Sequence, residues 1–115
     1  MEKQTKLVNL TPHEVTIYDE NGNVKLRIPP SGQVARVKSR QVKIGEINGI
    51  PVFKTEFYDI EGLPDPQPDT VYIVSLLVLQ ACRDRKDLVA PDTSPQGAVR
   101  DSEGKIIGTR GFQVL

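Results

Sequence analysis

Two Asn-Gly pairs, each placed between segments in which apolar and polar residues alternate, constrain the fold of this chain most strongly. Asparagine and glycine accept the positive backbone φ angles of a tight turn, and alternation with a period of two is typical of half-buried strands. Asn21-Gly22 and Asn48-Gly49 therefore each predict a β-hairpin. Pro51, in the second strand of the second hairpin, indicates an edge strand, because proline cannot donate to a strand ladder.

Turn sequences divide the rest of the chain in a similar way. Residues 71–75 predict the most buried strand, and Ser75 can cap a short helix over residues 76–86. The alternative for this segment is a longer buried strand that continues through Leu79, because short apolar runs are ambiguous by periodicity. The turn at residues 101–104 predicts a third hairpin. We therefore expect a mainly β, α+β fold in which antiparallel hairpins form a small sheet or a partly open barrel, with one short helix.

Length and composition limit the kind of protein. The 115 residues fit one domain, so residues 1–115 are interpreted as a single unit. Residues 1–6 do not look like a secretion signal, and the apolar run at 71–79 is far shorter than the roughly 20 residues that span a bilayer. With one cysteine, these features predict a cytoplasmic protein that binds no membrane, in the host cytosol if a phage encodes it.

The charge balance argues against nucleic acid as a partner. The chain has 15 basic and 15 acidic residues, whereas duplex binding normally rests on a surplus of Lys and Arg. A local basic patch can still hold one small anion. We therefore expect no sequence-specific nucleic-acid binding.

The densest charged region extends from Arg83 to Arg110 and suggests an anion or nucleotide site. Guanidinium groups match phosphate in geometry, and an aromatic ring can stack on a base. The alternative without ligand binding is a solvated helix end with ion pairs. For the strand that carries Arg36, the alternative is the solvent-exposed face of a half-buried sheet. The candidate ligand-binding residues are Arg36, Tyr72, Arg83, Arg85, Asp92, Arg100, Arg110 and Phe112.

No self-sufficient catalytic group is evident, so we expect a protein that is not an enzyme and uses no metal or cofactor. His13 is the only histidine, and no spacing links it to a nucleophile and a carboxylate. The acidic residues after Cys82 alternate with arginines that would neutralise them, which argues against a metal site. Cys82 itself is interpreted as a small packing residue on an apolar helix face.

Several short phrases along the chain resemble a family of small uncharacterised proteins of phages, prophages and bacterial genomes. They include Asn9-Leu10-Thr11-Pro12-His13, Tyr72-Ile73-Val74-Ser75, Arg85-Lys86-Asp87-Leu88 and the segment from Val99 to Gly108. The resemblance spans nearly the whole chain and brings no catalytic residues with it. A looser likeness, at the level of class, is to phage anti-defence sponges of the anti-Thoeris and anti-CBASS kind, which sequester cyclic nucleotide signals.

Three functions follow from these observations. The first is a small homo-oligomeric protein that sequesters a nucleotide-derived anionic signal without cleaving it. The second is a protein–protein interaction module, either a host-enzyme inhibitor or a minor phage structural component. The third is a dUTPase-like hydrolase, because Thr109-Arg110-Gly111-Phe112 faintly resembles the C-terminal arm of trimeric dUTPases. The glycine-rich continuation and the aspartate-tyrosine substrate motif of that family are missing.

Overall fold

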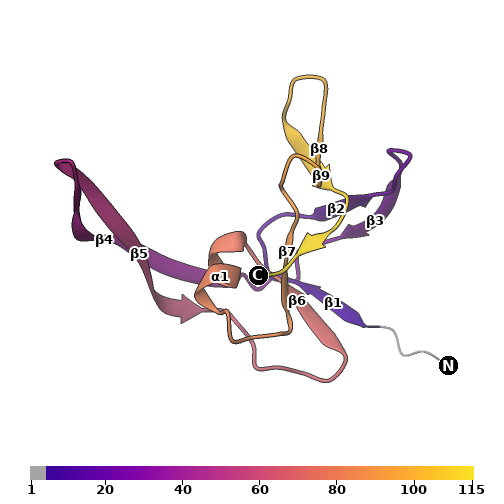
Figure 1. Ribbon diagram of the computed structural model, residues 1–115. Coiled ribbons are helices and arrows are strands. Elements are labelled where there is room, and N and C mark those ends of the chain that lie inside the picture. The colour runs from indigo at the N-terminus through magenta and orange to yellow at the C-terminus, as the bar shows by residue number, and fades with distance from the viewer. Residues whose placement is uncertain (1–4) are drawn as a thin grey trace.

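Three open β-sheets and one short helix make up the protein, and about 49% of its residues lie in strands. The structure is a computed structural model and describes residues 5–115 (Figure 1). Residues 1–4, on which the expectation about a secretion signal partly rests, lie outside that range. The elements in chain order are β1 (Lys6–Asn9), β2 (Val15–Tyr18), β3 (Val24–Ile28), β4 (Arg36–Ile47), β5 (Ile50–Glu61), β6 (Thr70–Ile73), α1 (Leu76–Ala81), β7 (Leu88–Pro91), β8 (Ala98–Arg100), β9 (Ile106–Thr109) and β10 (Phe112–Gln113).

The mainly β fold with one short helix is confirmed. The strands form open sheets, and a partly open barrel was the alternative expectation. The first sheet has the order β1-β6-β7-β10. Here β6 pairs in parallel with both β1 and β7, and only β10 runs antiparallel to its neighbour. Parallel neighbours need a crossover connection, and α1 forms part of the one between β6 and β7. The hairpin signals in the sequence did not predict these parallel pairs.

The second sheet joins two predicted hairpins. Its order is β3-β2-β9-β8, with the antiparallel pairs β2–β3 and β8–β9 at the two edges. The two hairpins meet where β2 and β9 pair in parallel, at Ile17 and Thr109. Gly22, with a φ of 80°, provides the turn that the first Asn-Gly pair predicted.

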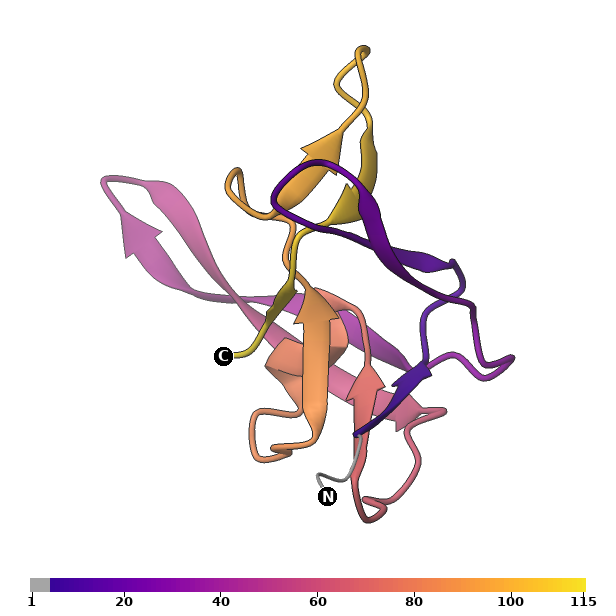
Figure 2. The same ribbon diagram turned by 90° about the vertical axis from the view of Figure 1, so that its right-hand side faces the viewer.

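The third sheet is a long two-stranded hairpin, β4–β5, which we call the arm. Asn48 and Gly49 have φ angles of 52° and 78°, so the second Asn-Gly pair forms the predicted turn. Each strand has 12 residues, and neither pairs with any other strand within residues 5–115. Pro51 therefore lies on an edge strand, as predicted. Both views show the arm projecting away from the rest of the molecule (Figures 1 and 2).

The helix is shorter than the sequence predicted. Ser75 accepts a hydrogen bond through Oγ from the backbone N–H of Val78 at 3.3 Å, which confirms it as the N-cap. The helix ends at Ala81, and Cys82 leaves the helical conformation with φ −118° and ψ 51°. The predicted span of 76–86 was therefore too long, and the basic residues after Cys82 lie in the following turns. The alternative of a strand through Leu79 was wrong.

Strand β6 is central because its two sides face two different clusters of buried residues. Consecutive strand residues point to opposite faces. Tyr72 belongs to the cluster around α1, with Leu10, Val78 and Leu88, whereas Ile73 belongs to a cluster formed with strands of the second sheet. The members of this second cluster are Val15, Ile17, Ile28 and Ile73.

The side chain of Asn9, which is 1% exposed, joins the first sheet to the second. Its Nδ2 donates to the carbonyl oxygens of His13 at 2.8 Å and Ile28 at 3.0 Å. Its Oδ1 accepts from the backbone N–H of Thr11 at 2.9 Å and from the Thr11 hydroxyl at 2.6 Å. All four bonds are made at the point where β1 ends and the chain turns towards β2, so this asparagine fixes both the turn and the end of β3.

Replacing Asn9 with alanine should lower the free energy of unfolding by about 2–3 kcal/mol, because the buried carbonyl of Ile28 and the partly buried carbonyl of His13 lose their donor. Urea unfolding followed by circular dichroism measures the change. The matched control is Gln41→Ala, which removes the hydrogen bond between an exposed arm side chain and Thr55 at 3.1 Å. We expect the control to change stability by less than about 0.5 kcal/mol. Equal losses in both variants would contradict the role of Asn9.

Candidate functional site

The candidate arginines do not form one site. Arg83 and Arg85 lie before β7, while Arg100 and Arg110 lie after it, on or beside the β8–β9 hairpin. Arg83 and Arg85 line one hollow, and Arg110 lines a different one next to Lys25. The hollow that Arg110 lines also contains Asp19 and Glu20, which offset its positive charge.

Three of these arginines bind groups of their own chain. Arg85 donates from Nε and Nη2 to both carboxylate oxygens of Asp87, at 2.8 and 2.7 Å, and from Nη2 to the carbonyl of Pro64 at 3.0 Å. Arg100 donates to the carbonyl of Gly104 at 2.7 Å. Arg110 donates to the carbonyls of Gln96 and Ala98, at 3.2 and 3.4 Å. These bonds fix turns of the chain.

The other candidate residues also lie apart. Tyr72 is 3% exposed, and its hydroxyl donates to the carbonyl of Asp65 at 3.1 Å, so its ring has no free face for a base. Phe112 is half-buried against the second core cluster. Asp92 accepts from the N–H of Ser94 at 3.0 Å, and hydrogen bonds with Ser94 hold the pKa of this carboxyl below its usual value. Arg36 lies opposite Glu61 in the β4–β5 ladder, at the base of the arm.

The segment that resembles a dUTPase arm is folded into the protein. Thr109 is 2% exposed, and its hydroxyl donates to the carbonyls of Asp92 and Gly111, both at 2.8 Å. Phe112 then begins β10, which pairs with β7.

One hollow retains the character of an anion site, at the end of α1. It has a volume of about 330 Å³, and its wall includes the apolar residues Leu79, Leu88 and Val114. Arg83 and Lys86 lie at the same hollow, and within residues 5–115 neither side chain makes an ion pair or hydrogen bond. We call this the cationic hollow. Cys82 contributes a buried thiol, whose pKa is raised mainly by burial, so it packs as the sequence predicted.

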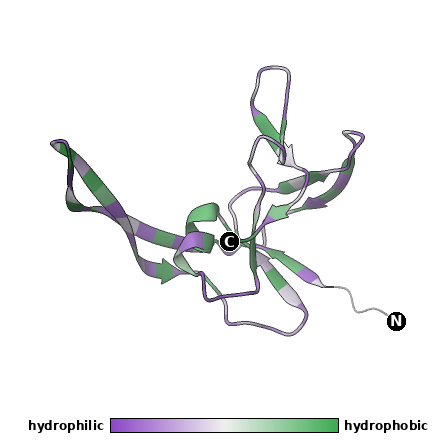
Figure 3. Ribbon diagram, in the orientation of Figure 1, coloured by the Kyte–Doolittle hydropathy of each residue, from purple (hydrophilic) through white to green (hydrophobic). Residues whose placement is uncertain are grey.

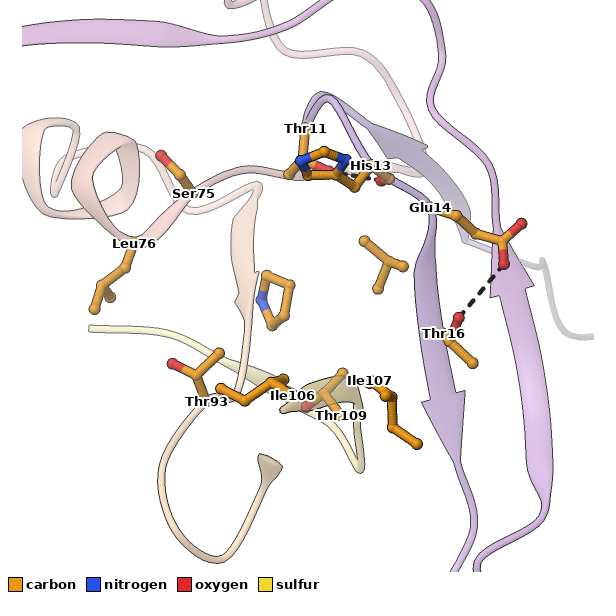
Figure 4. Close-up of a pocket in the computed structure, with 13 residues that line it drawn as sticks. Thr11, His13, Glu14, Thr16, Ser75, Leu76, Thr93, Ile106, Ile107 and Thr109 are labelled. Atoms are coloured by element: carbon orange, nitrogen blue, oxygen red, sulfur yellow. Dashed lines mark hydrogen bonds between the residues drawn. The ribbon is translucent and has the colours of Figure 1, made fainter. Parts of the chain in front are cut away.

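A second hollow of about 340 Å³, which we call the apolar hollow, lies where the two larger sheets meet the start of α1 (Figure 4). Leu76, Ile106 and Ile107 line it and are 38%, 42% and 43% exposed. His13 also lines it, together with Ser75. The Ser75 hydroxyl caps α1, and no hydrogen bond joins it to His13 in the described chain. The hollow is therefore mainly an apolar surface.

Apart from Val114 and Leu115, the most exposed large apolar side chains within residues 5–115 lie on the arm. Ile47 and Ile50 are 64% and 66% exposed and directly opposite one another, so they share a face of the hairpin, and Val52 follows on that face. Phe53, on the other face, is 55% exposed. Figure 3 shows apolar bands alternating with polar ones along the whole arm. We call Ile47, Ile50 and Phe53 the arm tip.

The dimensions of the protein reflect its open arrangement of three sheets, including the projecting arm. The radius of gyration is 16.7 Å, against about 13 Å for a compact chain of this length. The accessible surface is 8293 Å², whereas a compact monomer of 12.8 kDa would expose about 6,300 Å². The difference of about 2,000 Å² exceeds the area that one partner buries in a standard protein interface, about 800 Å².

Sequence reasoning predicted the hairpin turn but not the exposure of Ile47, Ile50 and Phe53 near its tip. The available signal was the sequence of residues 36–61. Side chains alternate between the two faces of each strand there, and charged residues occupy many positions that are apolar in a half-buried strand. Such a pattern gives neither strand a continuous apolar face to bury against the core.

Among residues 5–115 there is no group of three or more histidine, cysteine, aspartate or glutamate side chains arranged to hold a metal ion. None of these residues belongs to a helix with the length and apolar character that crossing a membrane requires. No protein-family model, curated protein or solved structure matches this chain.

The Arg85–Asp87 pair predicts a pH-dependent contribution to stability. The hydrogen bond from Arg85 holds the pKa of Asp87 below its usual value, and the two side chains are only 20% and 18% exposed. A carboxyl with a lowered folded pKa stabilises the protein above its unfolded pKa of about 3.9, and this contribution is lost as pH falls through the folded pKa.

Replacing Asp87 with asparagine should therefore cost about 2 kcal/mol near pH 7 and progressively less below about pH 4. Urea unfolding of both proteins across this range measures the difference. Asp65→Asn is the matched control, because that exposed carboxylate makes no hydrogen bond or ion pair within the described residues. A difference for Asp87→Asn that does not change with pH would contradict the pairing.

Proposed function

We propose that this chain is a non-catalytic protein–protein interaction module that binds through its arm tip. One observation carries the proposal: Ile47, Ile50 and Phe53 are each more than half exposed on an arm that no other strand covers within residues 5–115. Ile47 and Ile50 are neighbours on one face and Phe53 lies on the other, and exposed apolar surface that is contiguous marks interaction sites. A two-stranded hairpin is at best marginally stable alone in water, so contact with a partner stabilises the arm as well as the complex.

The resemblance to phage and prophage proteins supports a role in an infected bacterial cell. Of the two roles that an interaction module can have there, a minor structural component fits the arm better than an enzyme inhibitor. The arm projects away from the rest of the molecule and can reach a neighbouring subunit (Figures 1 and 2). The Ser75 hydroxyl is committed to capping α1, which supports a role without catalysis.

A photo-cross-linking amino acid at position 50 tests this proposal. After irradiation of bacterial cells that express the full chain, we expect protein adducts from position 50, because the arm tip lies in an interface. The control position is Asn21, which lies in the exposed turn of the β2–β3 hairpin. Absence of any protein adduct from position 50, or equal adducts from both positions, would refute the proposal.

The cationic hollow supports a second candidate function, the sequestration of a nucleotide-derived anionic signal. Its volume of about 330 Å³ lies within the range of about 300–1,000 Å³ that small-ligand pockets occupy. Arg83 and Lys86 can hold phosphate, and the exposed side chains of Val114 and Leu115 can contact an apolar or aromatic part of the ligand. Of the arginines that the sequence predicted as ligand-binding residues, this proposal keeps Arg83. Lys86 takes the place of the arginines that lie elsewhere.

Calorimetry with a panel of cyclic nucleotides and ADP-ribose isomers tests the cationic hollow. We expect binding by the unaltered chain and at least about tenfold weaker binding after Arg83→Ala with Lys86→Ala, because hydrogen bonds to charged groups are strong. Arg100→Ala is the control, since Arg100 binds the carbonyl of Gly104 on a different hairpin. No heat with any ligand, or equal loss in the control, would rule out this second function.

A further inference from the structure

We infer that the arm tip of one copy of this chain docks into the apolar hollow of a second copy. The inference rests on the proposed function and names its partner. Both surfaces belong to the same chain and both are apolar: the tip presents Ile47, Ile50 and Phe53, and the hollow presents Leu76, Ile106 and Ile107.

The arm tip and the hollow of one chain lie far apart. The arm leaves the molecule beside α1 and extends away from the sheet that contains β9 in both views (Figures 1 and 2). Its strands pair along their whole length, from Arg36 opposite Glu61 to Ile47 opposite Ile50, so the tip stays at the far end. The tip can therefore meet an apolar hollow of this kind only on another molecule.

The shapes of the two surfaces are complementary. A hairpin tip is a narrow projection, and the hollow is a concave space of about 340 Å³ between the start of α1, β2 and β9 (Figure 4). The polar groups that line it, including His13 and Thr16, can contact the polar backbone of an inserted turn. An apolar projection entering an apolar recess removes both surfaces from water, which is the main driving force of association.

Charge favours a second copy over a charged macromolecule. The arm has five basic and four acidic residues, and Arg40–Glu56 and Lys43–Glu46 form ion pairs on it, at 3.0 and 2.7 Å. The whole chain carries no net charge. Two copies therefore do not repel one another, and the arm offers no excess of positive charge to nucleic acid.

The molecule as a whole also leaves more surface uncovered than a compact monomer of its mass would. The chain exposes about 2,000 Å² more than a compact monomer, and a standard interface buries about 800 Å² on each partner. Each chain has one tip and one hollow, so every copy can both donate an arm and receive one. This arrangement closes into a dimer or ring, or extends as a filament.

Mixing two complementary variants tests the inference. Ile50→Glu with Phe53→Glu disables the tip, and Leu76→Glu with Ile106→Glu disables the hollow. Glutamate at position 76 is compatible with the first turn of α1, where negative charge is favourable. Leu26→Glu is the matched control, because Leu26 is 45% exposed on β3, away from both surfaces.

Light scattering coupled to size exclusion measures the mass, and circular dichroism verifies that each variant is folded. We expect the unaltered chain and the control to be oligomers, and each double variant to be a monomer of about 12.8 kDa. An equimolar mixture of the two variants should form a heterodimer, because it retains one intact tip and one intact hollow.

The inference is overturned if the unaltered chain is monomeric, if the folded variants remain oligomeric, or if the mixture stays monomeric. Cross-linking from position 50 then separates the two proposals. Adducts with a different protein would leave the interaction module standing and remove the second copy as its partner. Absence of any adduct would remove both.

Discussion

The hydrogen bonds of Asn9 determine how the two larger sheets are joined. Its amide reaches the carbonyl of Ile28 at the end of β3, and its carbonyl oxygen holds the turn at Thr11. The backbone continues the connection, since the carbonyl of Asn9 accepts from Ser31 and that of Leu10 accepts from Ala35, at 3.0 and 2.9 Å. Because Ala35 directly precedes β4, the same short segment also anchors the base of the arm.

Both candidate surfaces follow from this junction. The apolar hollow exists because β2 starts beside the end of β6, where Ser75 caps α1 and directs Leu76 towards the strands of the second sheet. The arm leaves on the other side, where Gly62 passes so close to the carbonyl of Val34 that a Cβ at position 62 would collide with it. The core of the protein thus positions an apolar recess and an apolar projection that cannot meet within one molecule.

The sequence predicted the features that local chemistry determines. Asn-Gly turns and the Ser75 cap depend on residues close together in the chain, and each is present in the structure. The parallel pairing of β6 with β1 and β7 depends on contacts between remote segments, and alternation alone does not identify a strand's neighbour. The arginine site was predicted from proximity in sequence, but β7 separates its members and nearby carbonyl groups bind most of them.

The arm presents a further problem, because two exposed strand edges can pair with any other unpaired strand. Several features limit such pairing: Pro51 removes a donor from β5, irregularities at Arg36/Lys38 and Lys43/Gly45 distort β4, and the arm carries charged side chains, including the ion pairs Arg40–Glu56 and Lys43–Glu46. At the tip Pro51 also limits strand addition, but the side chains of Ile47 and Ile50 stay 64% and 66% exposed. Association through strand edges is therefore disfavoured along the arm, while association through the tip side chains is not. This difference favours a defined contact with a recess over open-ended strand addition.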